Sequence, residues 1–453
     1  MTIVNPATEE IIGELAEDTR ETLERKLQKL RTAQPEWYAI GLKKRIEIVL
    51  RFAKLLEQDL EHLAEILTSE VGKPLQQSRN EINGAAARAN WLAENALPYL
   101  SDEVMSSEPG LTEKISYEPL GVIGNISAWN YPYLVGTNVF IPALLAGNAV
   151  LYKPSEFSTL TGVEICRVLK NAGVPDDAFM IAVGGRTVGE CMLEMPLDGY
   201  FFTGSYKTGK YIYEKVASKM VPCQCELGGK DPVYVADDVV DIREVAAATA
   251  DGAFYNNGQS CCAVERIYVH ENVYERYVEE FVKEVQGFKL GNPKEDGVYI
   301  GPLTRKSQLD LLQDQVDEAV KYGAILHTGG KRVEGLGYYF EPTVLSHVTH
   351  QMGVMRDESF GPVIGIMKVK DDKEAIDWMS DTNYGLTAAV YSQDESRADV
   401  ILRALNVGTA YWNCCDRVSA ALPWSGRKHS GFGSTLGHAG LRAFTKPKAF
   451  HLK

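Results

Sequence analysis

The stretch GVIGNI at residues 121–126 is a short apolar run of the kind that forms a buried strand, and it decides the fold class. Two further runs, AVLY at 149–152 and MIAV at 180–183, follow it, with helical patterns between them. Strands that alternate with helices in this way predict βαβ units, in which helices cover a parallel sheet. The segment that begins at residue 121 is therefore predicted to be an α/β domain.

A second series of the same kind runs over residues 232–391. It begins with PVYV at 232–235 and RIYV at 266–269, and a helix is predicted between them at 241–253. A chain of 453 residues also exceeds what one hydrophobic core usually organises. We therefore expect two α/β domains.

Other segments lie outside these two series. Residues 42–71 carry apolar side chains at a helical period, with charges on the opposite face, which predicts one long amphipathic helix. It should end at Gly72-Lys73-Pro74, because glycine caps a helix and proline interrupts it. Residues 112–117 and 443–452 are typical of isolated strands that belong to neither sheet.

The overall composition limits the classes of ligand. Hydrophobic residues make up 45% of the chain and charged residues 24%, as in ordinary globular proteins. The formal net charge of −14 argues against nucleic acid and anionic membranes as partners, because both require clustered Lys and Arg. Residues 1–10 lack the basic and apolar regions of a secretory signal, and no apolar run reaches about 18 residues. We expect small-molecule ligands and a cytoplasmic location.

The cysteines cluster along the chain instead of spreading as a disulfide framework would. A long chain without a secretory signal keeps such thiols reduced. Zinc binding is the competing interpretation, but the chain has neither a C-x2-C pair nor an H-x3–5-H pair, so we expect no bound metal. The cysteines are Cys166, Cys191, Cys223, Cys225, Cys261, Cys262, Cys414 and Cys415.

Cys261 has surroundings unlike those of a core residue. It follows NNGQS at 256–260, which is polar and contains glycine, and strand-like residues come after Cys262. An accessible thiol with a base nearby is a nucleophile. A buried structural cysteine fits the same pattern, so this segment alone leaves both interpretations open.

Two polar side chains could serve such a nucleophile. Glu226 begins ELGGK at 226–230, a glycine turn between the two α/β series, and ligands commonly bind between domains. Asn130 lies in WNYP at 129–132, and its amide can donate to a developing oxyanion. A solvated turn for Glu226 and a turn with aromatic packing for Asn130 are the structural alternatives.

Taken together, these segments resemble the motifs of the aldehyde dehydrogenase superfamily in their order along the chain. The resemblance spans essentially the whole sequence. The matching segments are VNPAT at 4–8, EVGKP at 70–74, KPSE at 153–156, FTGS at 202–205 with Gly209, ELGGK at 226–230, GQSC at 258–261 and ESFGPV at 358–363.

The resemblance implies the aldehyde dehydrogenase fold, which is an α/β architecture with a Rossmann-like cofactor domain, an α/β catalytic domain and a small β oligomerisation element. The expected NAD-binding domain comprises residues 1–99 and 120–227, and the catalytic domain comprises residues 228–429. Residues 100–119 and 430–453 would form the oligomerisation element, whose exposed strand edges pair between subunits. A homodimer or a dimer of dimers is implied.

The resemblance also implies the NAD(P)-dependent oxidation of an aldehyde to a carboxylic acid. The Cys261 thiolate would attack the aldehyde, while the Asn130 amide and the Cys261 backbone N–H hold the oxyanion. Glu226 would then be the general base that hydrolyses the thioester. CoA-acylating relatives commonly lack this glutamate, so a free acid is the expected product, and Cys262 is structural by register. A non-enzymatic protein of the same fold is the alternative, although it would normally have lost Cys261 or Glu226.

The usual G-x-G-x-x-G dinucleotide motif is absent from the chain. By resemblance, Ser205 and the helix N-terminus that follows Gly204 would receive the pyrophosphate. Lys153 and Glu156 would reach the adenosine ribose, and because a carboxylate there repels a 2′-phosphate, NAD is expected in preference to NADP. Glu358 matches the ligand of the nicotinamide ribose. The full expected set is Ile126, Ser127, Trp129, Lys153, Ser155, Glu156, Gly204, Ser205, Gly209, Leu227, Glu358 and Phe360.

The choice of aldehyde stays open among semialdehydes, amino or betaine aldehydes, and aromatic or aliphatic aldehydes. Aromatic side chains at the family's channel positions could stack an aromatic aldehyde, hold a quaternary ammonium by cation–π attraction, or line a generic apolar channel. Asp416 or Arg417 could pair with a charged substrate. The channel positions are Tyr131, Val135, Tyr255, Val418 and Trp424.

Many relatives carry a buried Lys and Glu that together help to relay the proton away from the general base. In register, these positions are Val139 and Thr435, so neither charge is present. The joint loss is chemically sensible, because one of the two charges left alone in a buried channel is costly. We expect the proton to leave Glu226 through water or the backbone.

Overall fold

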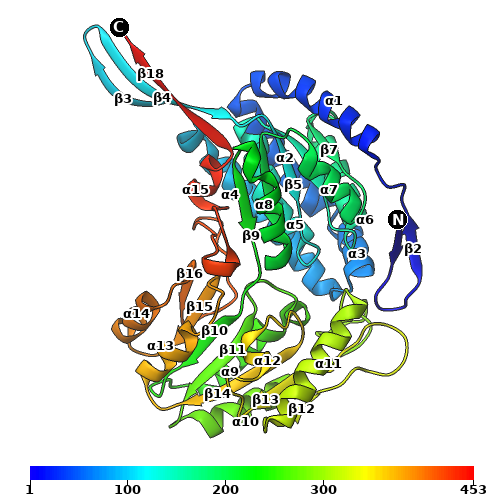
Figure 1. The fold of residues 1–453 in the computed structure, drawn as a ribbon, viewed down its shortest axis with the longest axis vertical. Coiled ribbons are helices and arrows are strands. Elements are labelled where there is room, and N and C mark those ends of the chain that lie inside the picture. The colour runs from blue at the N-terminus through cyan, green and yellow to red at the C-terminus, as the bar shows by residue number, and fades with distance from the viewer.

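The computed structural model describes residues 1–453 and contains two large sheets and a protruding three-stranded arm (Figure 1). The first sheet pairs its strands in parallel, except that its β17 edge is antiparallel. Its spatial order is β17 (Gly431–Phe432), β9 (Cys223–Glu226), β8 (Gly199–Thr203), β5 (Val122–Ile126), β6 (Ala149–Lys153) and β7 (Phe179–Ile181).

Helices cover the first sheet, and their apolar sides form two hydrophobic cores with its strands. The N-terminal hairpin of β1 (Thr2–Val4) and β2 (Ile11–Glu14) lies beside them. The helices are α1 (Arg20–Ala39), α2 (Leu42–Gln58), α3 (Leu60–Val71), α4 (Leu75–Leu100), α5 (Pro132–Ala146), α6 (Thr159–Ala172), α7 (Arg186–Glu194) and α8 (Tyr206–Val216), with the short η1 (Ala217–Lys219) after α8.

The prediction of one helix over residues 42–71 is wrong, because α2 and α3 are separate helices. Asp59 lies between them with a backbone conformation outside the helical region, at φ −97° and ψ 12°. Short polar side chains compete with helical hydrogen bonding, and the Asp59 carboxylate instead pairs with Arg167 of α6 at 2.6 Å. The predicted end is confirmed, since Gly72 caps α3 in the left-handed conformation.

The second sheet forms the other large unit of the chain, and it extends beyond the predicted residues 232–391 to Trp412. Its order is β12 (Ile325–Thr328), β13 (Thr343–Ser346), β14 (Val363–Val369), β11 (Val264–His270), β10 (Asp231–Val235), β15 (Thr387–Tyr391) and β16 (Thr409–Trp412). Only β12 is antiparallel to its neighbour. The helices of this unit are α9 (Ile242–Phe254), η2 (Tyr255–Gly258), α10 (Tyr274–Gln286), α11 (Lys306–Lys321), α12 (Gly353–Arg356), α13 (Asp372–Ser380) and α14 (Glu395–Ala404).

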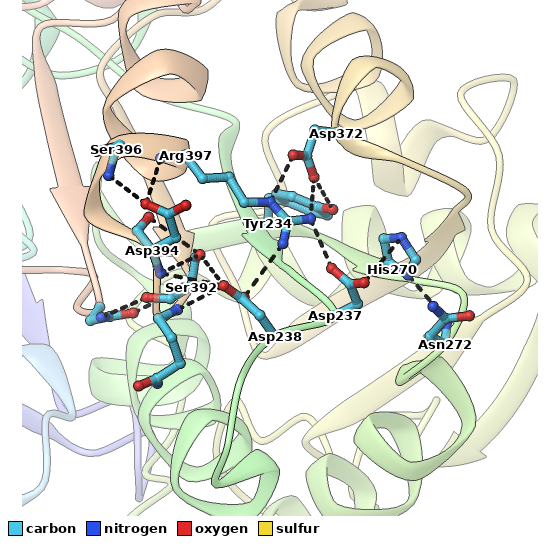
Figure 2. A network of polar contacts seen from close by, with 12 residues as sticks. Tyr234, Asp237, Asp238, His270, Asn272, Asp372, Ser392, Asp394, Ser396 and Arg397 are labelled. Atoms are coloured by element: carbon cyan, nitrogen blue, oxygen red, sulfur yellow. Dashed lines mark hydrogen bonds and ion pairs between the residues drawn. The ribbon is translucent and has the colours of Figure 1, made fainter.

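A polar network ties together the segments that follow β10 and β15 (Figure 2). Arg397 of α14 pairs with Asp237 at 2.8 Å and Asp372 at 2.5 Å, and it lies 3.6 Å from Asp238. The Tyr234 hydroxyl also donates to Asp372 at 2.8 Å. One guanidinium therefore serves three carboxylates at this edge of the sheet.

The arm consists of β3 (Glu103–Glu108), β4 (Leu111–Pro119) and β18 (Thr445–Leu452), with β4 in the middle. The predicted strands at 112–117 and 443–452 therefore lie outside both large sheets and pair with each other. The expected boundary placed all of residues 430–453 with this element, whereas Gly431–Phe432 pairs with β9 in the first sheet. The short helix η3 (Lys428–Ser430) precedes β17, and α15 (Gly437–Arg442) lies between β17 and β18. No helix is both long enough and apolar enough to cross a membrane.

Candidate active site

A cavity of about 790 Å3 is lined by residues from both large units of the chain. Cys261, Glu226 and Asn130 all line it, although they are far apart in the sequence. The structure therefore brings the three expected catalytic side chains to one space.

The loop that carries Cys261 is held in an unusual backbone conformation. Asn256, Asn257 and Gly258 have φ values of 53°, 57° and 67°, in the left-handed region that Asn and Gly tolerate best. At Gly258 the requirement is also steric, because a Cβ there would lie 2.5 Å from the Gly361 carbonyl oxygen. The tight turn leaves Cys261 partly exposed to the cavity, whereas Cys262 is buried.

Side-chain amides fasten this loop to the first unit. The Asn256 backbone N–H donates to Gln77 of α4 at 2.9 Å, and its side chain donates to the Asn130 carbonyl at 3.1 Å. Asn257 exchanges two hydrogen bonds with the Gly301 backbone, at 2.7 and 3.1 Å. These hydrogen bonds hold the geometry of the loop, although the buried Asn256 Oδ1 has no hydrogen-bond partner.

Asn130 follows β5 and is buried. Its side-chain amide donates to the Gln259 carbonyl at 3.0 Å, which leaves its second N–H available for a ligand oxygen. The backbone carbonyl of Asn130 accepts a hydrogen bond from the Lys73 ammonium at 2.8 Å. Lys73 is fully buried, forms an ion pair with the equally buried Glu81, and lies 3.6 Å from the centre of the Tyr131 ring. This ion pair holds the Asn130-Tyr131 segment in place.

Glu226 is the last residue of β9, and its carboxylate is buried. The Thr435 hydroxyl donates to Oε1 at 2.5 Å, and the Gln224 amide makes a longer contact of 3.4 Å. Burial raises the pKa of Glu226 to about 7, while the Thr435 and Gln224 hydrogen bonds and the nearby Arg88 charge act in the opposite direction. A carboxyl with a pKa near neutrality is suited to general base chemistry.

The Glu358 carboxylate lies against the glycine turn that follows Glu226. It accepts from the Gly229 N–H at 3.0 Å, and a Cβ on Gly228 would clash with it. Burial and the negative charge of Glu265 raise the pKa of Glu358 to about 8. Glu265 pairs with the buried Lys230 at 2.5 Å and also accepts two backbone N–H groups just after Glu358, so this pair positions the loop.

The expected cofactor residues converge on the cavity, with one exception. Gly209 is absent from its wall and instead permits α8 to approach Leu227, because a Cβ there would lie 2.4 Å from that side chain. Ser205 is the N-cap of α8 and faces the cavity, as a pyrophosphate site at a helix N-terminus requires. Lys153, Glu156 and Glu358 supply polar groups along the same wall, so the residues present fit a dinucleotide. No group of three or more His, Cys, Asp or Glu side chains is arranged to hold a metal ion.

Several residues of the wall escaped the sequence analysis. They come mainly from the start of α7, the first half of α8 and the start of α11. The sequence signals there are Gly184-Gly185 before α7, Gly189 within it, and the segment from Gly204 to Gly209 at the start of α8. These residues are Gly185, Arg186, Gly189, Glu190, Lys207, Thr208, Tyr211, Arg305 and Gln308.

The expected channel residues lie outside the wall of this cavity. Trp424 and Val418 pack around Cys261 and Cys262 with Leu436. Tyr255 accepts a hydrogen bond from Asn80 at 3.0 Å, and Val135 occupies the first turn of α5. Asp416 lies beside the cluster that Trp424 and Val418 form around Cys262, and its carboxylate accepts a hydrogen bond from the Cys262 thiol at 3.0 Å.

Comparison with known proteins shows the family of the chain. The sequence profile of the aldehyde dehydrogenase family matches residues 1–450. Aminoaldehyde dehydrogenase 1 of Pisum sativum is 34% identical, over 98% of this chain and 91% of its own. The betaine aldehyde dehydrogenase of Bacillus subtilis is also 34% identical, over 98% of this chain and 92% of its own. The chain belongs to the aldehyde dehydrogenase family.

Solved structures extend the likeness to the whole fold. An NAD-dependent aldehyde dehydrogenase from Sinorhizobium meliloti matches with a TM-score of 0.96 at 29% identity, covering 100% of this chain and 91% of its own. An NADP-dependent enzyme from E. coli matches with a TM-score of 0.96 at 28% identity, covering 100% of this chain and 94% of its own. The activity is thus the NAD(P)-dependent oxidation of an aldehyde, and these relatives include users of either cofactor.

Proposed function

We propose that Cys261, Glu226 and Asn130 carry out this oxidation and that the product is a free carboxylic acid. The Cys261 thiolate attacks the aldehyde carbon, and the Asn130 side chain with the Cys261 N–H stabilises the oxyanion of the thiohemiacetal. NAD(P), which Lys153, Ser205 and Glu358 would hold, would accept the hydride that the thiohemiacetal loses when it becomes a thioester on Cys261. Glu226 takes a proton from the water that cleaves this thioester, releasing the acid and the thiolate.

The observation that carries this proposal is the shared cavity, whose wall contains all three side chains together with the cofactor-binding residues. The test is Glu226→Gln, because an amide does not accept the proton of water. We expect a burst of NADH about equal to the number of active sites, followed by little turnover. Undiminished steady-state turnover would remove Glu226 from the mechanism.

NAD is the cofactor that we propose as preferred. Glu156 lines the cavity beside Lys153, and a carboxylate there accepts hydrogen bonds from ribose hydroxyls but repels a 2′-phosphate. Glu156→Ser should narrow the ratio of kcat/KM for NAD to that for NADP. A higher kcat/KM for NADP in the unmodified enzyme would contradict the proposal.

The substrate class that we propose is an aldehyde with an amino or quaternary ammonium group. Asp416 and the neighbouring Asp251 place negative charge beside Tyr255, which favours a cation. The names of the pea and Bacillus subtilis relatives fit this class. A kcat/KM panel of amino, anionic and aromatic aldehydes tests it, and Asp416→Asn should weaken only the cationic substrates.

A homodimer, or a dimer of dimers, is the assembly that we propose, built through the exposed edge of β18 in the arm. Removing residues 445–453 should then yield a monomer by light scattering.

We also propose a reducing compartment such as the cytoplasm, because the eight cysteines are all free thiols.

A further inference from the structure

Thr435 makes the shortest hydrogen bond to the proposed general base. Its hydroxyl oxygen lies 2.5 Å from Glu226 Oε1, and its own exposed fraction is 0%. An ionised carboxylate only accepts hydrogen bonds, so in this contact the hydroxyl is the donor and the ionised form of Glu226 is the one it stabilises. The contact joins residues that are 209 positions apart in the chain.

The backbone of Thr435 is held independently of this contact. It forms an antiparallel bridge with Trp424, through hydrogen bonds of 2.9 Å and 2.6 Å. Gly440 of α15 packs directly on it, because a Cβ on Gly440 would lie 2.6 Å from the Thr435 carbonyl carbon. Four residues earlier, Gly431 pairs with Glu226 itself. The backbone contacts of residues 431–435 therefore fix the position of the Thr435 hydroxyl beside Glu226 Oε1.

Other groups around Glu226 are fewer and weaker in contact. Gln224 of β9 reaches Oε1 at 3.4 Å. Arg88 of α4 contributes a buried positive charge, but its hydrogen bonds go to the Asn138 side chain at 2.7 Å and the Leu134 carbonyl at 3.4 Å. Val139 of α5 offers no polar atom. The Trp424 side chain also lowers the pKa of Glu226 by hydrogen bonding, but its effect is smaller than that of Thr435. Thr435 therefore makes the shortest hydrogen bond to the carboxylate.

We propose that Thr435 is the positioning residue of the general base, which fixes the orientation of the Glu226 carboxylate and favours its ionised form for thioester hydrolysis. This inference rests on the proposed role of Glu226. The Thr435 hydroxyl acts without adding a charge to a buried site.

The test uses a nitrophenyl ester as substrate, because it acylates Cys261 without cofactor and so isolates hydrolysis. The thiolate displaces nitrophenolate in a burst, and water then cleaves the thioester in the steady state. Thr435→Val removes the hydroxyl at nearly constant volume. We expect the acid limb of the steady-state rate to move up by about one pH unit, so that hydrolysis at pH 7 falls about fivefold and recovers in alkali. The burst should be unchanged.

Thr435→Ser is the matched control, and it should keep the acid limb of the unmodified enzyme because it retains the donor. If the valine variant does not fold, Thr435→Ala compared with Thr435→Ser gives the same contrast. An unshifted acid limb, or an equal loss of rate at every pH, would overturn the proposal. Glu226→Gln separates the two hypotheses, since full hydrolysis by that variant would refute the general base itself whatever Thr435 does.

Discussion

The Cys262 thiol donates a hydrogen bond to the Asp416 carboxylate, with 3.0 Å between Sγ and Oδ1. A hydrogen bond with Cys261, burial and the charge of Asp416 raise the pKa of the Cys262 thiol well above its ordinary value. Cys262 is therefore held as a neutral thiol, while its neighbour Cys261 faces the cavity. The two adjacent cysteines have different chemical environments.

The different environments of Cys261 and Cys262 predict different effects when each is replaced by alanine. Cys261→Ala should abolish turnover and covalent labelling by an active-site thiol reagent, because the thiolate is the nucleophile. Cys262→Ala should retain substantial activity. The measurements are NADH formation and mass spectrometry of the labelled protein. An inactive Cys262→Ala beside an active Cys261→Ala would reverse the assignment.

The pKa of Glu226, raised to about 7 by burial, predicts a pH dependence. A general base works only when ionised, so a rate limited by hydrolysis should fall about tenfold per pH unit below about pH 7 and level off above it. The check is kcat between about pH 5 and about pH 9, with enzyme stability verified at each pH. A flat profile in the acid range would show that this carboxyl does not control the limiting step.

The buried Lys73–Glu81 pair predicts a coupled effect on stability and activity. Lys73→Met leaves the Glu81 carboxyl without a cationic partner at 0% side-chain exposure, which should cost about 3–5 kcal/mol of the free energy of unfolding. It also removes the donor to the Asn130 carbonyl, so kcat should fall. Urea unfolding and steady-state kinetics measure the two effects.

Lys73→Met combined with Glu81→Gln is the control for this pair. The amide oxygen can still accept the Tyr133 N–H that Glu81 accepts at 2.9 Å, but no unpaired charge remains. The double variant should therefore be more stable than Lys73→Met alone. Equal destabilisation of the two variants would show that the lost charge pairing is not the cause.

Apolar runs and helical periodicity in the sequence correctly predicted several strands and helices. The runs at 149–152 and 232–235 lie within β6 and β10, and Asp241 caps the helix predicted at 241–253. The hydrogen bond between Thr435 and Glu226 had no local signal, because β17 crosses back from the second unit to the first sheet. The buried Arg88 charge near Glu226 likewise depends on tertiary packing. Such long-range contacts are set by topology, which periodicity does not report.

The Arg397 network predicts how stability responds to acid (Figure 2). Burial alone would raise the pKa values of Asp237 and Asp372, but the Arg397 guanidinium holds both below their ordinary value. A carboxyl with a lowered pKa stabilises the fold above its unfolded pKa of about 4, and this contribution is lost as the pH falls through the lower folded value. Arg397→Met should cost about 1–3 kcal/mol at neutral pH, a modest loss because these side chains are partly exposed. In the variant three carboxylates face one another, so their protonation relieves repulsion and the deficit should shrink toward pH 4. Arg397→Lys should lose less of the free energy of unfolding at neutral pH than Arg397→Met. Urea unfolding of each variant at neutral pH and at about pH 4 measures these differences. A stability deficit of Arg397→Met that stays constant or grows on acidification would contradict this account.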